Sequence, residues 1–200
     1  MKSVALVLNS DQCNISQTLQ SLGENIDICI INRDSCSDVT KKLANTLVQN
    51  CCTSHSDYIE QIYVNGTIKR NTSNHRSYTY IEVDKTVEDL VEEGLKILSV
   101  YNDIILVINE NSIYRDGAVD KIVSKFNNDN CGFVYSDGHI NGNDDTLGAI
   151  DIMINYEIPI KNYAVRSKLV NLYNKNPFQF ALNCYKEWTI YHIPEYLYAL

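Results

Sequence analysis

Short apolar runs alternate along this chain with segments whose apolar residues recur every three or four positions. The runs at 3–8, 26–31 and 103–108 are almost continuously hydrophobic, as expected of strands that a sheet buries on both faces. The clearest helical segment carries one stripe of apolar side chains, Val87, Leu90, Val91, Leu95 and Leu98. Strands that alternate with helices predict a three-layer α/β domain with a largely parallel sheet.

Capping and turn residues predict the remaining elements. We expect further strands at 58–66, 77–83, 131–137 and 148–154, with a polar stretch between the first two and an Asn141-Gly142 hairpin turn between the last two. Whether 58–66 pairs with 77–83 stays open. Helix caps are expected at Asn14, Ser37-Asp38, Asp84 or Thr86, and Asn176, where Pro177 suits the first helical position. A short helix is expected around 166–173.

Composition limits the class of protein. Two hundred residues, of which 44% are hydrophobic and 21% charged, predict a single domain over 1–200 with a sizeable core. No stretch approaches ~18 consecutive apolar residues, so no membrane span is expected. A formal charge of -8 argues against a nucleic-acid partner, which requires a dense basic face. Seven scattered cysteines without a C-x-x-C pair predict reduced core thiols in a cytoplasmic protein.

Polar segments follow four of the predicted strands. They are Asn9-Ser10-Asp11, Asn32-Arg33-Asp34, Asn109-Glu110-Asn111 and Asp137-Gly138-His139. Ligands of α/β sheets bind outside the carboxyl ends of strands, where the strand order reverses, so we expect a crevice there. Polar loops are general at such ends, and periodicity alone does not identify the ligand. The chain contains neither a Gly-rich phosphate loop nor a G-x-S-x-G elbow.

Several segments, in order along the chain, resemble family-2 glycosyltransferases of the GT-A fold. "SVALVLNSDQCNISQTLQSL" is similar to the family's opening, and "IDICIINRDSCSDVTKKL" to its second strand and "VDDGSTDDT" loop. "NDIILVINENSIYRDGAVDKIVSKF" resembles the strand that ends in an Asp-x-Asp motif. Later segments match too: "CGFVYSDGHING", "PIKNYAVRSKLV" and, most specifically, "IYHIPEYLY". The resemblance implies a GT-A-like three-layer α/β/α sandwich with a mostly parallel mixed sheet.

The resemblance also implies a chemistry, the transfer of a sugar from a nucleotide-sugar donor to an acceptor. In the family, Asp-x-Asp holds Mn²⁺ or Mg²⁺ against the donor diphosphate, and an acidic residue near the start of the penultimate helix takes the acceptor proton. A residue of the second loop contacts the nucleobase. The resemblance therefore implies donor contacts for Ser10, Asp11, Arg33 and Asp34. It implies metal contacts for Asn109, Glu110, Asn111 and His192.

The sequence departs from the family at all three motifs. Asn109-Glu110-Asn111 has one carboxylate, and hard dications prefer anionic oxygen ligands, so metal affinity should fall. The base position falls near Lys175-Asn176-Pro177, which has no carboxylate, and the second loop reads Asn32-Arg33-Asp34. Asp137 is then the candidate catalytic base, although it equally suits the start of a hairpin. His192 lies two residues before Pro194 and is equally explained as a structural residue.

These observations leave functions of different classes open. The first is a glycosyltransferase that acts on an unknown acceptor. The second is a catalytically inactive glycosyltransferase-like domain that serves binding, assembly or regulation, which the three altered motifs favour. The third is an α/β nucleotide-binding protein outside this family. A protein partner or a second copy of the chain also remains open as a partner.

Overall fold

The computed structural model describes residues 1–9, 15–33, 37–38, 41–42, 46, 57–63, 65–72, 76–84, 86–109, 111–140, 143–145 and 160–199. The strands are β1 (Ser3–Leu8), β2 (Asp27–Arg33), β3 (Asp57–Tyr63), β4 (Gly66–Thr72), β5 (Ser77–Val83), β6 (Ile104–Ile108), β7 (Ile113–Tyr114), β8 (Cys131–Ile140), β9 (Asn143–Asp145), β10 (Tyr163–Arg166) and β11 (Thr189–Ala199). The α-helices are α1 (Ile15–Ser21), α3 (Leu90–Leu98), α4 (Ala118–Ser124) and α6 (Pro177–Tyr185), and two 3₁₀ helices are η1 (Lys125–Asn127) and η2 (Ser167–Leu172).

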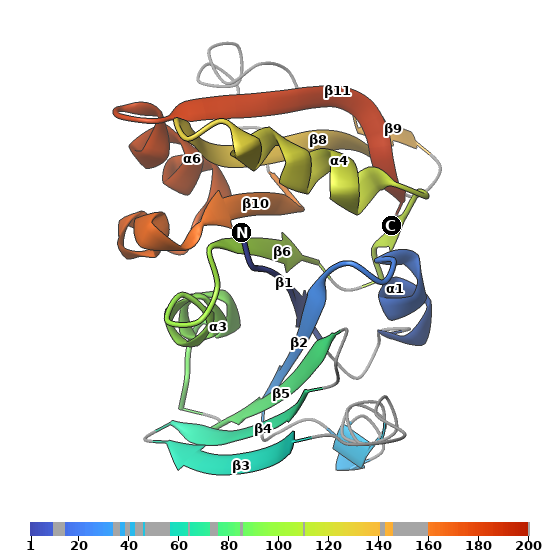
Figure 1. The fold of residues 1–200 in the computed structure, drawn as a ribbon, viewed down its shortest axis with the longest axis vertical. Coiled ribbons are helices and arrows are strands. Elements are labelled where there is room, and N and C mark those ends of the chain that lie inside the picture. Colours follow the sequence, from blue (N-terminus) through green and yellow to red (C-terminus); the bar gives the residue numbers. More distant parts are fainter. Residues whose placement is uncertain are drawn as a thin grey trace.

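All of these strands join one mixed sheet. Its order is β3-β4-β5-β2-β1-β6-β10-β8-β11-β7, with β9 paired to β8 (Figure 1). The central strands β5, β2, β1 and β6 are parallel, as are β8 and β11, while the other pairs are antiparallel. Since β1 lies between β2 and β6, the strand order reverses at β1. A ligand crevice is expected at the carboxyl ends of these strands.

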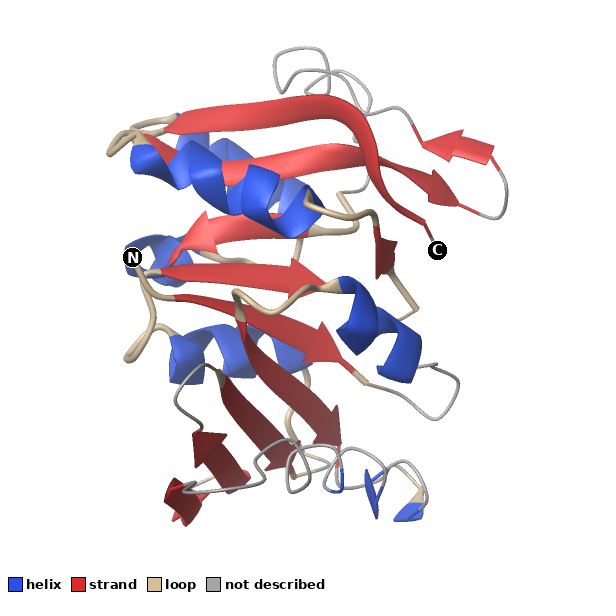
Figure 2. Ribbon diagram, turned by 45° about the vertical axis from the view of Figure 1, so that its right-hand side comes forward, coloured by secondary structure: helices blue, strands red, loops and turns tan. Residues whose placement is uncertain are grey.

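Side chains alternate between the two faces of the sheet, and helices cover both. From β1, Ala5 and Val7 enter the core that includes α1 and α4. Val4 and Leu6 enter the opposite core, with α3 and α6. Figures 1 and 2 show strands in the middle with helices on either side, so the three-layer α/β/α prediction is confirmed. Burial on both faces explains why the central strands read as continuous apolar runs.

Strands β4, β7, β9, β10 and β11 were not predicted. The polar stretch after β3 contains β4, which pairs antiparallel with both β3 and β5. Its alternation is obscured because lysine, arginine and asparagine occupy it near the edge of the sheet, where packing demands little. The turn into β4 depends on Gly66, whose φ is 150°. A Cβ there would lie 2.0 Å from the carbonyl oxygen of Glu82, so only glycine fits.

The predicted cap of α3 at Asp84 or Thr86 was wrong. Asp89 caps the helix, because its Oδ1 accepts hydrogen bonds from the backbone N–H groups of Val91 (2.8 Å) and Glu92 (3.0 Å). Further along, α3 passes close to β1, and a Cβ on Gly94 would lie 2.7 Å from a methyl carbon of Leu6. The side chain of Asp89 therefore fixes where α3 begins, and the absence of a side chain at Gly94 allows α3 to approach β1 closely.

The remaining predictions have mixed outcomes. Asn176 caps α6 with Pro177 in the first turn, as expected. The short helix near 166–173 is present as η2, and β8 pairs with β9 in an antiparallel hairpin. Asn14, Asn141-Gly142, the strand at 148–154 and most of the helix after Ser37-Asp38 lie outside the described residues. In the described ranges, no helix is long and apolar enough to cross a membrane. The single-domain expectation for 1–200 stays a prediction.

Candidate functional site

Two buried asparagines adjoin at the carboxyl ends of β1 and β2. The parallel register pairs Leu8 with Ile31, and the N–H of Asn9 donates to the carbonyl of Ile31 at 3.2 Å. Asn9 and Asn32 therefore stand side by side directly after the last pair. Both continue the alternation toward the face that carries α1 and α4. Asn9 is 3% exposed and Asn32 is 0% exposed.

The side-chain amide of Asn32 is buried with neither of its polar atoms satisfied. Both Oδ1 and Nδ2 have no hydrogen-bond partner in the described part of the chain. Leaving a buried polar group unpaired costs about 1–3 kcal/mol, and such exceptions commonly mark a functional site. The sequence prediction selected the neighbours Arg33 and Asp34 and missed Asn32. The available signal was an amide that continues the buried alternation of the strand.

A charged side chain lies beside Asn32. Glu82 of β5 is paired with Asn32 in the parallel register and points to the same face. Its carboxylate accepts a hydrogen bond from the Tyr80 hydroxyl at 3.0 Å and forms an ion pair with Lys41 at 3.3 Å. The carboxyl ends of three neighbouring strands thus form a polar row of two amides and one carboxylate.

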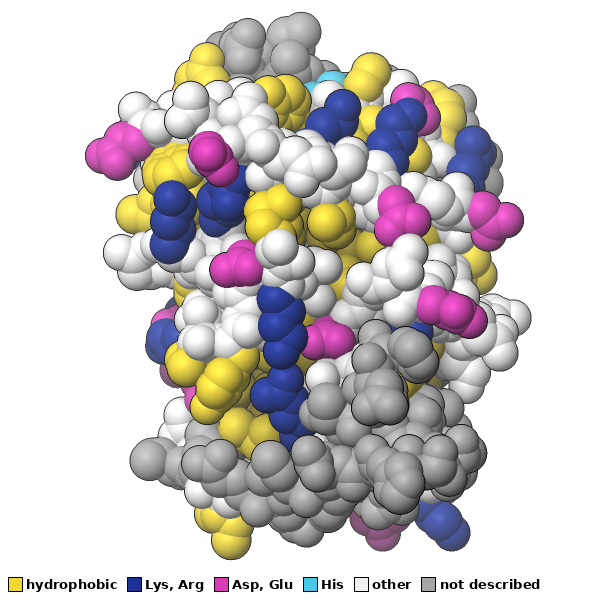
Figure 3. All heavy atoms as spheres, viewed as in Figure 1, with side chains coloured by type: hydrophobic (Ala, Val, Ile, Leu, Met, Phe, Trp, Pro, Cys, Tyr) yellow, Lys and Arg dark blue, Asp and Glu magenta, His cyan; other side chains and the backbone are white. Residues whose placement is uncertain are grey.

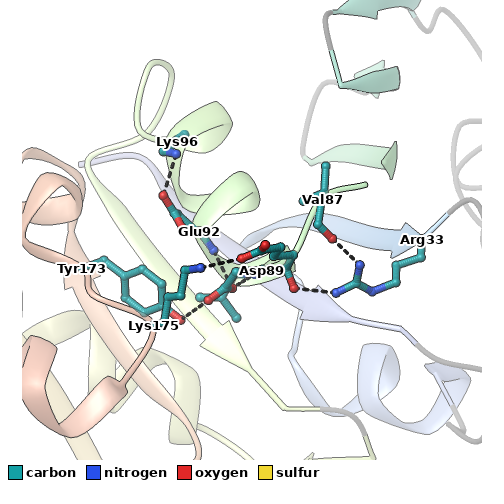
Figure 4. A network of polar contacts seen from close by, with 9 residues as sticks. Arg33, Val87, Asp89, Glu92, Lys96, Tyr173 and Lys175 are labelled. Carbon is teal, nitrogen blue, oxygen red and sulfur yellow. Dashed lines mark hydrogen bonds and ion pairs between the residues drawn. The ribbon is translucent and has the colours of Figure 1, made fainter. Parts of the chain in front are cut away.

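Arg33 points to the opposite face, toward the start of α3 (Figure 4). Its Nη1 donates to the carbonyl of Val87 and its Nη2 to the carbonyl of Glu88, the latter at 2.7 Å. A phosphate at Arg33 would have to compete with these two carbonyls. The predicted donor contact of Arg33 stays a prediction.

The same network reaches the segment that precedes α6. The Tyr173 hydroxyl donates to Oδ2 of Asp89 at 3.2 Å, and Lys175 pairs with Glu88 at 2.9 Å (Figure 4). Burial, and next the charge of Asp89, raise the pKa of Tyr173. The hydrogen bond from Lys175 lowers the pKa of Glu88. The base position of the resembled family is therefore tied here to carboxylates at the start of α3.

Asp137 and His192 form a buried pair across β8 and β11. Oδ1 of Asp137 and Nε2 of His192 are 2.7 Å apart, and their side chains are 5% and 14% exposed. The His192 ring stacks on Tyr135 with ring centroids 5.0 Å apart. Two residues predicted separately, one as base and one as metal ligand, are thus in direct contact.

This pair shares a face with the end of β6. Val107, Tyr163, Tyr135 and His192 occupy one row across the sheet. Asn109 and Asp137 each lie two residues beyond that row and point to the same side as α3 and α6. One strand, β10, lies between them, and the two inter-strand spacings correspond to about 10 Å.

A buried network of hydrogen bonds links Asn109, Ser112 and Asn162. The Asn109 N–H donates to Oδ1 of Asn162 at 2.7 Å, and the Ser112 hydroxyl donates to the Asn109 carbonyl at 2.7 Å. Nδ2 of Asn162 donates in turn to the Ser112 hydroxyl at 3.0 Å. Asn111 has φ 63°, a left-handed conformation that asparagine tolerates. Ser112 and Asn162 were missed by the sequence analysis, since no local pattern links residues 50 positions apart.

The described residues do not by themselves fit a divalent cation. No group of three His, Cys, Asp or Glu side chains is found among them. Asp137 and His192 supply two such groups but bind each other, and amide oxygens are weak ligands for a hard dication. Ser10, Asp11, Asp34 and Glu110 lie outside the described residues. We therefore derive no chemical step through a metal.

Comparisons with known proteins identify the fold. No family model matches the sequence, and no curated protein matches it. Among solved structures, residues 1–349 of Staphylococcus aureus TarS superpose with a TM-score of 0.66 at 10% identity, over 100% of this chain and 60% of that one. The same TarS fragment in complex with UDP-GlcNAc gives 0.66 at 11% identity, over 100% and 58%. The 4-diphosphocytidyl-2C-methyl-D-erythritol synthase of Anaerococcus prevotii gives 0.58 at 13% identity, over 98% and 90%.

The chain has a GT-A-like α/β fold, as these structural neighbours establish. It spans about 60% of the TarS fragment. Identities of this size define an architecture and leave the activity to be argued from the site.

Proposed function

We propose that this chain is a glycosyltransferase that binds a nucleotide-sugar donor at the carboxyl ends of β1, β2 and β6. The carrying observation is the buried, unpaired amide of Asn32 beside Asn9. It stands next to the strand-order reversal of a GT-A-like sheet. A TarS structure that shares this fold contains UDP-GlcNAc and another contains UDP, which supports a nucleotide as the ligand.

The amide of Asn32 is suited to a nucleobase edge. A nucleobase presents a donor and an acceptor side by side, and an asparagine amide presents the complementary acceptor and donor. Pairing would satisfy the two atoms of Asn32 that have no partner among the described residues. Because Asn32 is 0% exposed, the side chains that cover it must shift before a base can reach it.

Asp137 is the proposed base of the reaction. It lies on the α3 and α6 side of the sheet, whereas Asn32 lies on the α1 side, so the donor would have to extend past the carboxyl ends of the strands from one side to the other. The acceptor hydroxyl oxygen forms a bond to the anomeric carbon as the bond from that carbon to the diphosphate breaks, and its proton passes to Asp137. A single displacement of this kind inverts the configuration at the anomeric carbon. His192 holds the carboxylate of Asp137 in place through the 2.7 Å contact. The metal roles of Asn109, Glu110, Asn111 and His192, the donor contacts of Ser10, Asp11, Arg33 and Asp34, the acceptor and the cytoplasmic location stay predictions.

A second function is favoured by specific contacts. Arg33 already bonds two backbone carbonyls, Asp137 is paired with His192, and the described residues contain no three-ligand metal group. A domain that binds a nucleotide without transferring a sugar would have the same features. Binding and turnover must therefore be measured separately.

The first experiment is calorimetric titration of UDP, CDP and GDP into the purified protein, with and without Mn²⁺. We expect micromolar binding of one nucleotide, weakened at least tenfold by Asn32→Leu. Thr18→Val is the matched control, because it removes another buried, unpaired polar atom from α1. No binding to the folded wild-type protein, or equal binding by Asn32→Leu, would overturn the donor site.

Turnover distinguishes the two functions. If the chain is a transferase, hydrolysis or transfer of the matching nucleotide sugar falls at least 100-fold in Asp137→Asn while nucleotide binding is retained. Glu110→Ala then abolishes any Mn²⁺ dependence. Binding without turnover in the wild-type protein would support the non-catalytic function instead.

A further inference from the structure

A cavity lies at the opposite end of the sheet from the proposed donor site. It has a volume of about 200 Å³ and opens between the end of α3 and strands β4 and β5. Its walls include Val4, Ile68, Arg70, Thr79, Ile97 and Tyr101. Along β2 it adjoins Asp27, five residues before Asn32, which corresponds to about 16 Å of strand. It also lies on the other face of the sheet, since Ile68 packs in the core of α3.

Arg70 is the distinctive side chain of this cavity. Its Nε is buried and has no hydrogen-bond partner among the residues that the structure describes. The guanidinium carbon lies 5.7 Å from the centre of the Tyr101 ring, a cation–π contact at the mouth of the cavity. Thr79 stands directly opposite Arg70 in the β4–β5 register and adds a hydroxyl on the same face. A guanidinium that lacks an anionic partner in such a site is a ready receptor for one.

The other charged residue on the wall does not serve as that partner. Asp27 accepts a hydrogen bond from the backbone N–H of Ser77 at 2.8 Å, and its second oxygen lies 3.6 Å from Nζ of Lys2. Both oxygens of Asp27 are therefore engaged elsewhere. Its negative charge also disfavours a dianion such as phosphate, for which Arg70 would be the single cation on the wall.

Much of the rest of the wall is apolar, although Ser77, Thr79 and Asn102 also line it. Ile68, Ile97 and Leu98 line it, and Figure 3 shows hydrophobic surface beside basic side chains where Figure 1 has α3 above β5 and β4. A volume of 200 Å³ corresponds to roughly six or seven water molecules, which is below the size of pockets for drug-like ligands. The ligand must be small, with one charged end and one apolar end.

We propose that this cavity binds a small monocarboxylate, whose carboxylate pairs with Arg70 and whose aliphatic part lies among Ile68, Ile97 and Leu98. The proposal is independent of the nucleotide site, because the two sites share no described residue.

The test is calorimetric titration of hexanoate, hexan-1-ol and inorganic phosphate into the wild-type chain and two variants. Arg70→Gln removes the proposed cation. Lys69→Gln is the matched control, because it removes the same charge from the next residue of β4, whose register partner Tyr80 belongs to the opposite core. We expect hexanoate to bind the wild type and Lys69→Gln equally and Arg70→Gln at least tenfold more weakly. Hexan-1-ol and phosphate should each bind the wild type at least tenfold more weakly than hexanoate.

Each other result overturns the proposal. Equal hexanoate binding by Arg70→Gln, or hexan-1-ol binding as tightly as hexanoate, would remove the role of the charge. Phosphate binding more tightly than hexanoate would contradict the ligand class. Absence of hexanoate binding at millimolar concentration to the folded wild type would remove the site. The hexanoate and hexan-1-ol comparison needs only the wild-type chain, so it decides the matter even if Arg70→Gln fails to fold.

Discussion

Asn32 and Arg70 share an uncommon property at the residue scale. Each carries a buried polar atom without a hydrogen-bond partner in the described part of the chain, and the two lie at opposite ends of one sheet. Buried donors and acceptors are nearly always paired, because an unpaired one loses its bonds to water without compensation. Thr18 and Tyr163 also carry such an atom, so the two proposed sites rest on position as well: Asn32 lies at the carboxyl ends of the strands, and Arg70 lines a cavity.

The Asp137–His192 pair can be tested by its stability. Asp137→Ala should lower the free energy of unfolding by about 1–3 kcal/mol, because it leaves the half-buried imidazole without its acceptor. Asp137→Asn keeps an oxygen at that place and should cost less. Urea denaturation measures both, and a double-mutant cycle with His192→Ala isolates the contact. Glu195 lies on the same strand as His192 and forms an exposed ion pair with Lys121 of α4. Glu195→Gln breaks this pair and should cost less than ~1 kcal/mol. A cost for Asp137→Ala no larger than for Glu195→Gln would show that the pair contributes nothing.

At the scale of elements, α3 connects the Arg33 network with the Arg70 cavity. Val87, Glu88 and Asp89, which directly precede α3, contact Arg33, Tyr173 and Lys175 (Figure 4), and the last turn of α3 lines the Arg70 cavity. Nine residues of helix correspond to about 13 Å. Asp89 serves both purposes at the start, since one oxygen caps the helix and the other accepts from Tyr173.

Substitutions at Asp89 separate these two purposes. Asp89→Ala should lower the free energy of unfolding by about 1–2 kcal/mol, the usual cost of a lost cap. Asp89→Ser keeps an acceptor for the helix N–H groups but loses the Tyr173 bond, so its cost should be smaller. Asp84→Ala should change stability by less than ~0.5 kcal/mol, because the structure does not use Asp84 as the cap. Chemical denaturation checks all three, and a larger loss at Asp84 than at Asp89 would contradict the assigned cap.

Across the whole molecule, the buried parallel strands at the centre of the sheet could be predicted from the sequence. Outside them, β3 and β8 were predicted, whereas β4, β7, β9, β10 and β11 were not. β1, β2, β5 and β6 are buried on both faces, so their composition alone identifies them. β4 lies near an edge, where polar residues satisfy the same backbone pairing, and no pattern distinguishes it from a loop. The cap of α3 was misplaced because three possible capping residues, Asp84, Thr86 and Asp89, precede that helix, and only geometry selects Asp89.

The candidate site, too, could be predicted from the sequence only in part. The carboxyl ends of strands could be predicted because parallel topology fixes where they gather. The contact of Asp137 with His192 depends on the parallel pairing of β8 with β11, which spans 55 residues and leaves no local trace. Asn32 was not selected because what distinguishes it is the lack of hydrogen-bond partners among the described residues of the folded chain, and this cannot be read from the sequence.

The buried thiols predict how the free energy of unfolding of the whole chain changes at alkaline pH. Cys29, Cys131 and Cys184 are free and buried, as predicted, and the other four cysteines lie outside the described residues. Burial raises the pKa of Cys131 to about 11 and that of Cys184 to about 12, from an ordinary value of 9.0. It raises the pKa of Cys29 further, against the opposing charge of Arg70.

Stability is expected to fall as the pH rises, because the folded chain holds its thiol protons more tightly than the unfolded chain does. Above pH 9.0 the unfolded chain loses thiol protons that the folded chain retains, so stability is full below that pH and falls above it. The slope is ~1.4 kcal/mol per pH unit for each thiol. Urea denaturation at several pH values between 8 and 10 measures this slope, which Cys184→Ala should reduce by the share of one thiol. A free energy of unfolding that stays constant over that range would contradict the burial of these groups.

Gly66 limits the substitutions that this chain can accept during evolution. The carbonyl of Glu82 occupies the place where any side chain at residue 66 would begin. Thr67 and Lys69 of β4 are only partly buried, so these positions can exchange one amino acid for another with little cost. Residue 66 cannot, unless β4 moves away from β5. In related sequences, residue 66 should therefore stay glycine, while the partly exposed positions of the hairpin vary.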